Sequence, residues 1–184
     1  KAESRGLGDV YKRQVFDMDE TLGHFSQLNI FWSILKEYFS KYNYNYSNQD
    51  FFRLVDTFNL FLRPEIIKIL NYLIEEKKNK RCDKIMIYTN NQGPKSWAES
   101  IKDYFHEKLK YKIFDQIIGA FKVGGKQIEV CRTSHYKSIK DFINCTKLPE
   151  STRILFIDDQ HHPEMEGNNV CLLYTSPSPR DSAL

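Results

Sequence analysis

The sequence lacks several features that would assign it to a special class of protein. No apolar run approaches the roughly 20 residues that span a membrane. No stretch has the basic start, apolar middle and small-residue cleavage site of a signal peptide. The four cysteines form no CxxC pair, and the default for such cysteines is a reduced thiol inside the cell. We therefore expect an intracellular protein, cytoplasmic or nuclear, with reduced thiols.

The sequence also lacks a large excess of either positive or negative charge. The formal net charge is +3 over 184 residues, too small to indicate a nucleic acid or an acidic membrane as partner. The hydrophobic fraction of 41% and the charged fraction of 28% are ordinary for a globular protein. We find no internal repeat, and the length suits one domain with a real core.

The two ends differ in character from the middle. Residues 1–14 and 171–184 resemble translated sequencing adapters, which recur at the ends of metagenomic and transcriptomic gene models. A central parallel strand is buried on both faces and should be a nearly continuous apolar run, yet Lys12, Arg13 and Gln14 precede the first apolar pair at 15–16. The other end is a Ser/Pro tail with nothing to bury. We therefore take residues 15–170 as the authentic domain.

Within that domain, segments of two periodicities alternate. Short apolar runs predict strands at 15–16, 84–88, 116–121 and 153–157, and a fifth that begins at 169–170 and is cut off by the tail. Apolar residues at helical spacing predict helices over 27–42, 51–61, 63–74, 94–110 and 138–146. The alternation predicts an α/β fold with a doubly wound parallel sheet, and residues 23–62 form a small helical insert after the first strand.

Acidic residues follow the first strand, and their spacing suits group-transfer chemistry. Asp17 and Asp19 stand two residues apart in the loop after 15–16. In phosphoryl transfer, Asp17 would attack phosphorus and form an aspartyl-phosphate. Asp19 would protonate the leaving oxygen and then activate the water that releases phosphate.

A second acidic pair follows the fourth strand. The carboxyl ends of parallel strands meet at one edge of a sheet, so Asp158 and Asp159 should lie near the first pair. Asp17 and Asp158, with the backbone carbonyl of Asp19, would hold a hard cation, and Mg²⁺ is the ion that suits these ligands best. Asp159 would orient the remaining metal ligands.

Phosphate-binding groups are expected at the same edge. Thr89 and Asn90 follow the second strand, and the Thr89 hydroxyl with nearby backbone N–H groups would hold phosphoryl oxygens. A lysine would offset the accumulated negative charge. Ser138 and Asp141 form a helix-cap pattern, which places Lys137 in the loop that faces the strand ends. Lys140, inside the first turn, is the alternative.

These motifs resemble those of the haloacid dehalogenase (HAD) superfamily. The first is Asp17-Met-Asp19-Glu-Thr21, the second ends in Thr89, the third supplies Lys137 and the fourth is Asp158-Asp159. Residues 113–119 also look like a connector found in that family. The resemblance spans essentially all of 15–170 and implies a Rossmann-like core with a Mg²⁺-dependent phosphatase activity.

Within that superfamily, the closest resemblance is to the serine/threonine phosphatases of the RNA polymerase II C-terminal domain, the NLI-interacting-factor-like group. The segment from Asp17 to His24 and the pair Arg63-Pro64 carry it. Glu65 departs from the usual Gly after that pair, and the insert looks helical where those enzymes have a small open flap. A phosphorylated protein is the substrate that this resemblance implies. A small-molecule phosphatase for nucleotides or sugars and a non-catalytic phosphate-binding relative remain as alternatives. A receiver-type module uses the same residue types, but its acidic pair precedes its phospho-acceptor, which is the reverse of the order here.

Two further features admit a structural or a functional interpretation. The insert at 23–62 is rich in aromatic residues and could be a packed helical hairpin, a cap over the site, or both. The adjacent His161 and His162 suggest zinc, but adjacent histidines converge on a metal less well than spaced ones, and the acidic pairs favour a harder ion. We interpret them as loop residues near the site.

Overall fold

The computed structural model describes residues 13–174, and its centre is a five-stranded parallel sheet. The strand order is β3-β2-β1-β6-β7. The bounds are β1 Arg13–Phe16, β2 Lys84–Tyr88, β3 Gln116–Ile118, β6 Ile154–Asp158 and β7 Val170–Tyr174. Because the order reverses at β1, with β2 on one side and β6 on the other, the sheet is doubly wound and the predicted α/β fold is confirmed.

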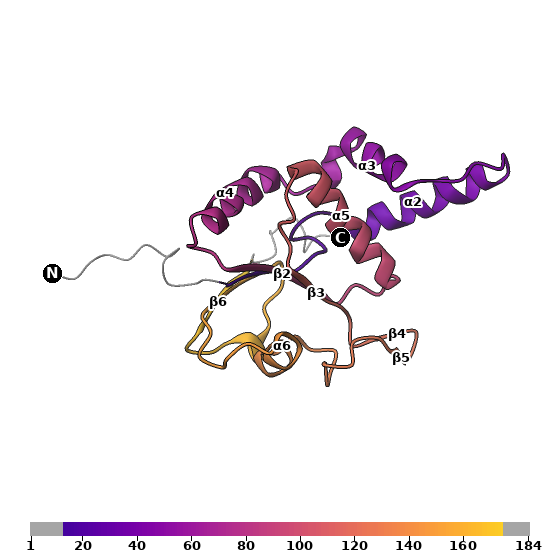
Figure 1. Cartoon of the computed structure of the whole chain (residues 1–184). Coiled ribbons are helices and arrows are strands. Elements are labelled where there is room, and N and C mark those ends of the chain that lie inside the picture. The colour runs from indigo at the N-terminus through magenta and orange to yellow at the C-terminus, as the bar shows by residue number, and fades with distance from the viewer. Residues whose placement is uncertain (1–12, 175–184) are drawn as a thin grey trace, which may run out of the picture.

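Helices cover both faces of this sheet, as Figure 1 shows. On one face lie α2 (Phe25–Ser40), α3 (Asn48–Thr57), α4 (Ile66–Lys78) and α5 (Lys95–Leu109). On the other lie α6 (Ile139–Thr146) and the hairpin of β4 (Lys122–Val123) and β5 (Lys126–Gln127). Two short 3₁₀ turns complete the elements, η1 (Asn59–Phe61) and η2 (Pro163–Met165).

The two hydrophobic cores follow from the alternation of side chains along each strand. In β2, Ile85 and Ile87 join the core with α2 to α5. Their neighbours Met86 and Tyr88 join the core beside α6. The central strands are buried on both faces, as a parallel sheet requires.

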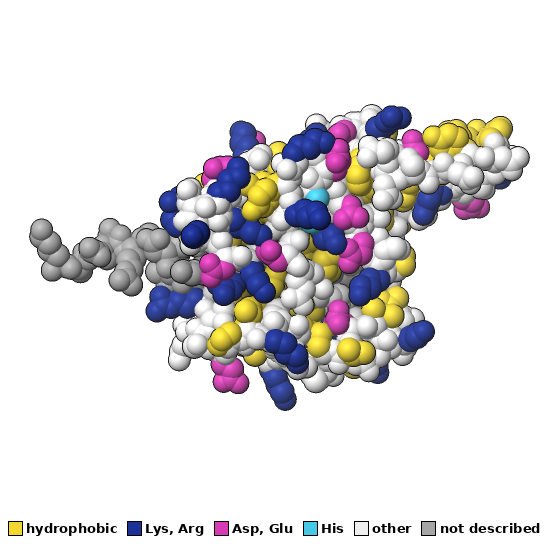
Figure 2. All heavy atoms as spheres, viewed as in Figure 1, with side chains coloured by type: hydrophobic (Ala, Val, Ile, Leu, Met, Phe, Trp, Pro, Cys, Tyr) yellow, Lys and Arg dark blue, Asp and Glu magenta, His cyan; other side chains and the backbone are white. Residues whose placement is uncertain are grey.

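The insert at 23–62 packs mainly against α5. Phe51 lies 5.3 Å from Trp97 between ring centroids, and Phe52 lies 6.0 Å from Tyr104. These contacts make the insert part of the helical layer. The far end of α2 extends beyond that layer (Figure 1) and carries exposed apolar side chains (Figure 2). Over the rest of the molecular surface that Figure 2 shows, Lys and Arg side chains are interspersed with Asp and Glu side chains.

The strands at the two ends reach further than the sequence pattern predicts. Arg13 and Gln14 belong to β1, where Gln14 is buried and Arg13 pairs with Asp83. Strand β7 continues through Tyr174 beside β6, so the expected break after residue 170 is wrong. The physical reason is that Leu172 packs against the core beside α6. The adapter-like origin of 1–14 and 171–184 stays a prediction, and residues 1–12 and 175–184 lie outside the described residues.

The expectation of four reduced thiols is wrong for one pair. Cys131 and Cys145 form a disulfide with Cα atoms 5.0 Å apart, while Cys82 and Cys171 are free. Sequence spacing did not reveal the pair because the fold, not a CxxC motif, brings the two residues together. Disulfides persist mainly in oxidising compartments, so the thiols no longer support an intracellular location. Between residues 13 and 174, no helix has the length and apolar character needed to cross a membrane.

Candidate active site

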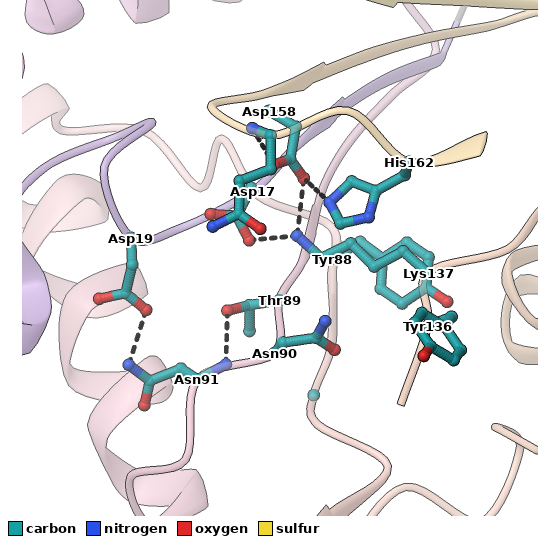
Figure 3. A network of polar contacts seen from close by, with 12 residues as sticks. Asp17, Asp19, Tyr88, Thr89, Asn90, Asn91, Tyr136, Lys137, Asp158 and His162 are labelled. Atoms are coloured by element: carbon teal, nitrogen blue, oxygen red, sulfur yellow. Dashed lines mark hydrogen bonds and ion pairs between the residues drawn. The ribbon is translucent and has the colours of Figure 1, made fainter. Parts of the chain in front are cut away.

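The polar residues predicted at the strand ends line one cavity. It has a volume of about 300 Å³ and lies at the carboxyl edge of the sheet. Figure 3 shows its central residues, which come from the ends of β1, β2 and β6 and from the loop before α6. The cavity is lined by Asp17, Asp19, Glu20, Ser26, Thr89, Asn90, Asn91, Gln92, Lys137, Asp158, Asp159, Gln160 and His162.

The loop after β1 is held in a tight turn. Glu20 has a positive φ of 58°, and its N–H donates to the Gly23 carbonyl at 2.8 Å. A Cβ atom on Gly23 would lie only 2.5 Å from the Phe61 carbonyl oxygen. The N–H of His24 donates to that same oxygen at 2.7 Å. Glycine is therefore needed at 23, because η1 passes directly against this loop.

Lys137 bridges the two acids at the ends of the central strands. Its ammonium nitrogen contacts Asp17 Oδ1 and lies 2.7 Å from Asp158 Oδ2 (Figure 3). All three side chains are buried. Burial raises the pKa of Asp17 to about 7, although the positive charge of Lys137 acts in the opposite direction.

Asp158 is held in its ionised form by several neighbours. Burial alone would raise its pKa, but the contacts from His162 and Lys137 outweigh burial and hold the pKa below its usual range. His162 Nε2 lies 3.1 Å from Asp158 Oδ2, and the Gln160 N–H donates to Asp158 Oδ1 at 2.9 Å. For Asp159, burial and the neighbouring charge of Asp158 raise the pKa.

Asp19 is oriented by residues from two other elements. Asn91 Nδ2 donates to Asp19 Oδ2 at 2.7 Å, and Ser26 Oγ donates to Asp19 Oδ1 at 3.0 Å. Ser26 is the one residue of α2 that lines the described cavity. The insert thus reaches the rim of the site through the first turn of α2.

The loop after β2 presents its polar groups in a fixed arrangement. The Asn91 N–H donates to Thr89 Oγ1 at 3.0 Å. Asn90 Oδ1 accepts from Arg132 Nη1 at 2.8 Å. Thr89 is buried yet lines the cavity, and the Asn91 N–H fixes the position of its hydroxyl.

Three carboxylates are close enough to share a cation. Asp17, Asp158 and Asp159 each offer an oxygen, and these atoms lie within 4.8 Å of one another. Oxygen ligands suit a hard divalent ion such as Mg²⁺. Three carboxylates beside one lysine also leave a surplus of negative charge. The Asp19 carboxylate is not in this group, and its bonds to Ser26 and Asn91 account for its different position.

All of the predicted site residues line this cavity. Of the two candidate lysines, Lys137 reaches the acids, whereas Lys140 lies exposed on α6. Sequence reasoning missed Ser26 and the buried Arg132, and it placed Asn91 at this edge of the sheet without giving it a role. It also placed His162 only in a nearby loop. Asn91 follows directly on the second motif, so its position was a usable signal; nothing in the pattern singled out Ser26 or Arg132.

Comparisons with known proteins add little to this geometry. No family model matches the chain, and no curated protein matches it. Among solved structures, the chain is similar to YfnB from Bacillus subtilis, described as a HAD-hydrolase bound to magnesium. The TM-score is 0.40 and the identity 13%, over 92% of this chain and 91% of that chain. A similarity this low assigns no activity to this chain.

Proposed function

We propose that this chain is a Mg²⁺-dependent phosphatase of the HAD superfamily that hydrolyses phosphate monoesters through an aspartyl-phosphate. The observation that carries the proposal is the cluster of Asp17, Asp158 and Asp159, in which Lys137 pairs with Asp17 and Asp158, with the Asp19 carboxylate held apart from it. One acid in the cluster and one outside it supply the nucleophile and the proton donor that the reaction needs.

The first half-reaction uses both acids of the β1 loop. A carboxylate oxygen of Asp17 attacks phosphorus and forms an acyl-phosphate bond, while the bond from phosphorus to the leaving oxygen breaks. Asp19 donates its proton to that oxygen. The bonds from Ser26 and Asn91 fix the direction in which Asp19 presents its carboxyl group.

The second half-reaction restores the enzyme. Asp19, now ionised, accepts a proton from water as the water oxygen attacks phosphorus. The acyl-phosphate bond breaks, inorganic phosphate leaves and Asp17 returns to its carboxylate form. Lys137 offsets the charge of the phosphoryl oxygens, and the Thr89 hydroxyl and the loop through Asn90 bind them.

The cation would be held by Asp17, Asp158 and the Asp19 carbonyl, with Asp159 orienting its remaining ligands. When bound, Mg²⁺ neutralises the surplus carboxylate charge and polarises the phosphoryl group. The donor set fits this ion because it is composed of oxygen atoms alone.

For the substrate, we propose a phosphoserine or phosphothreonine protein. The resemblance of the segment from Asp17 to His24 and of Arg63-Pro64 to the C-terminal-domain phosphatases supports this class. A small-molecule phosphatase is the second candidate, and it is favoured by the position of Ser26, which brings the insert to the cavity rim. A panel of phosphopeptides and phosphorylated metabolites separates the two: turnover of many metabolites and of no peptide would sink the protein-phosphatase assignment.

The activity itself is tested by hydrolysis of an aryl phosphate with and without Mg²⁺, by the parent protein and its Asp17→Asn variant. We expect metal-dependent turnover that falls by about 10⁴-fold or more in the variant. Asp103→Asn, an acid on α5 outside the cavity, is the matched control and should keep full turnover. Turnover that survives Asp17→Asn, or a folded parent with none, would contradict the proposed mechanism.

A further inference from the structure

The largest fully buried side chain in the described part of the molecule is that of Arg132, which is 1% exposed. Burying a guanidinium is costly unless its donors are paired. Burial also lowers the pKa of this group, which shows that the environment opposes its charge. None of its hydrogen-bond acceptors among the described residues is a carboxylate. A buried charge without an ion pair calls for an explanation other than a salt bridge.

The acceptors of Arg132 fall into two sets. Nη1 donates to the Thr89 carbonyl at 3.2 Å, to Asn90 Oδ1 at 2.8 Å and to the Gly119 carbonyl at 2.9 Å. These groups stand where β2 and β3 end. One terminal nitrogen of Arg132 therefore ties the loop after β2, which carries Thr89 and Asn90, to the end of the neighbouring strand β3.

The second terminal nitrogen holds a different segment. Nη2 donates to the carbonyls of His135 and Tyr136, both at 3.1 Å. These are the two residues immediately before Lys137, whose ammonium group reaches the acids of the cavity. The planar guanidinium holds the two donor nitrogens at a fixed separation. It thereby sets the distance between the loop that carries Thr89 and the turn that carries Lys137.

The guanidinium is itself held in place. Its central carbon lies 4.9 Å from the ring centroid of Tyr88, whose hydroxyl accepts from the Ser138 N–H at 3.3 Å. The preceding residue, Cys131, is joined to α6 by the disulfide to Cys145. The backbone and the side chain of Arg132 are therefore both anchored, as a residue that positions others must be.

We propose that Arg132 is a positioning residue that holds the Thr89–Asn90 loop and the Lys137 turn in register for binding a phosphoryl group. Arg132 is not part of the metal cluster and does not itself line the described cavity. It acts through its hydrogen bonds to residues that do line the cavity or that precede Lys137. The phosphoryl part of this proposal rests on the proposed function, whereas the mechanical link between the two segments does not.

The test uses Arg132→Lys and Arg132→Met in the full chain. Lysine keeps the charge but has one nitrogen, so it can serve only one of the two sets of acceptors. Methionine fills the space and serves neither. The matched control is Arg81→Lys. Arg81 makes bidentate hydrogen bonds to Glu76 near the opposite edge of the sheet. The Arg81→Lys variant therefore reports the effect of lost stability without a change at the site.

Two readouts are needed, both well below the melting temperature of every variant. Hydrogen–deuterium exchange should rise together in peptides that cover 89–91 and 135–137 for both Arg132 variants, and near 76–82 alone for Arg81→Lys. Calorimetric titration with inorganic phosphate in the presence of Mg²⁺ should show binding weakened about 10- to 100-fold by Arg132→Lys and within about twofold of the parent for Arg81→Lys.

Each outcome decides a different point. Exchange that rises in one segment only, or in neither, would overturn the proposal, and so would joint loosening with unchanged phosphate affinity. A parent protein that binds no phosphate would overturn the proposed function, while joint loosening of the two segments would still support the link through Arg132.

Discussion

The two edges of the sheet use charged residues in opposite ways. At the amino edge, acids and bases pair one to one and remain partly open to solvent. Glu76 is 7% exposed and its partner Arg81 is 48% exposed, and Lys77 lies 2.8 Å from Asp115. At the carboxyl edge, the side chains of Lys137 and Asp158 are 3% and 1% exposed.

The difference between the edges is one of charge balance as well as burial. At the amino edge, Glu76, Asp115 and Asp83 each pair with a base of their own, so these pairs need nothing further to neutralise them. At the carboxyl edge, Asp17 and Asp158 share Lys137, and the half-buried Asp159 lies beside them. Buried carboxylates in excess of bases destabilise a fold unless a cation or a bound ligand offsets them. The ion pairs of the amino edge therefore stabilise the fold, whereas the carboxyl edge carries an excess of negative charge that a cation or a ligand can offset.

The sharpest way to test this contrast is to change an acid of the carboxyl edge that is outside the metal cluster. Asp19→Asn should lower turnover of an alkyl phosphate by about 10²- to 10⁴-fold, because its leaving oxygen needs a proton. An aryl phosphate, with a better leaving group, should lose less in the first step. Stopped-flow kinetics on both substrates measures this. Equal loss in the rate of phosphoenzyme formation for the two substrates would contradict the assignment of Asp19 as proton donor.

A backbone change should affect both stability and activity at the carboxyl edge. Gly23→Ala forces a Cβ against the Phe61 carbonyl oxygen, so we expect a loss of about 1–3 kcal/mol in the free energy of unfolding and a raised KM. The control is Gly124→Ala, where a Cβ meets open space and only the positive φ of 56° is unfavourable. Its KM should not change. Urea unfolding and steady-state kinetics test this, and a Gly23→Ala variant with parental KM would show that the turn does not position the site.

At the amino edge, a change should affect stability alone. Glu76→Gln removes the negative charge that pairs with Arg81 and one of the two acceptor oxygens, and we expect the melting temperature to fall by about 2–4 °C with kcat unchanged. Hydrogen bonding from Arg81 lowers the pKa of Glu76 below its ordinary 4.5. A lowered pKa stabilises the fold above the ordinary value, and this stabilisation is lost as pH falls through the lowered one.

The difference in melting temperature between Glu76→Gln and the parent should therefore be constant near neutral pH and shrink below about pH 4.5. Glu75→Gln is the matched control on the same helix, because the Glu75 pair with Lys78 is exposed on both sides and contributes little. Calorimetric melts from pH 3 to 7 measure both variants. A Glu76→Gln difference that grows on acidification would contradict this account of the pair.

The fold and most residues at the carboxyl edge could be predicted from the sequence. Strands alternated with helices clearly enough to give the fold, and a parallel sheet brings its strand ends together. Asp17, Thr89 and Asp158 could therefore be placed in one site from the sequence alone. Lys137 could be preferred over Lys140 because Ser138 caps α6, and the Ser138 hydroxyl does accept from the Asp141 N–H.

What could not be predicted depends on tertiary contacts between segments without regular structure. Arg132 stands in a polar stretch with no periodicity, and its role depends on carbonyl groups from three separate segments. The disulfide joins Cys131 to Cys145 on α6, 14 residues further along the chain, and no spacing rule for cysteine pairs covers it. The insert at 23–62 was correctly predicted to be helical, but its packing on α5 follows from aromatic contacts that sequence spacing does not specify.

The most direct test of the central claim is to trap the covalent intermediate. The parent protein is mixed with an aryl phosphate and Mg²⁺, quenched in acid within milliseconds, digested and analysed by tandem mass spectrometry. We predict a phosphoryl group on Asp17 that is absent from Asp17→Asn and accumulates in Asp19→Asn, where its hydrolysis is slow. Steady turnover with no phosphoryl group on Asp17, or with the group on another residue, would contradict the account.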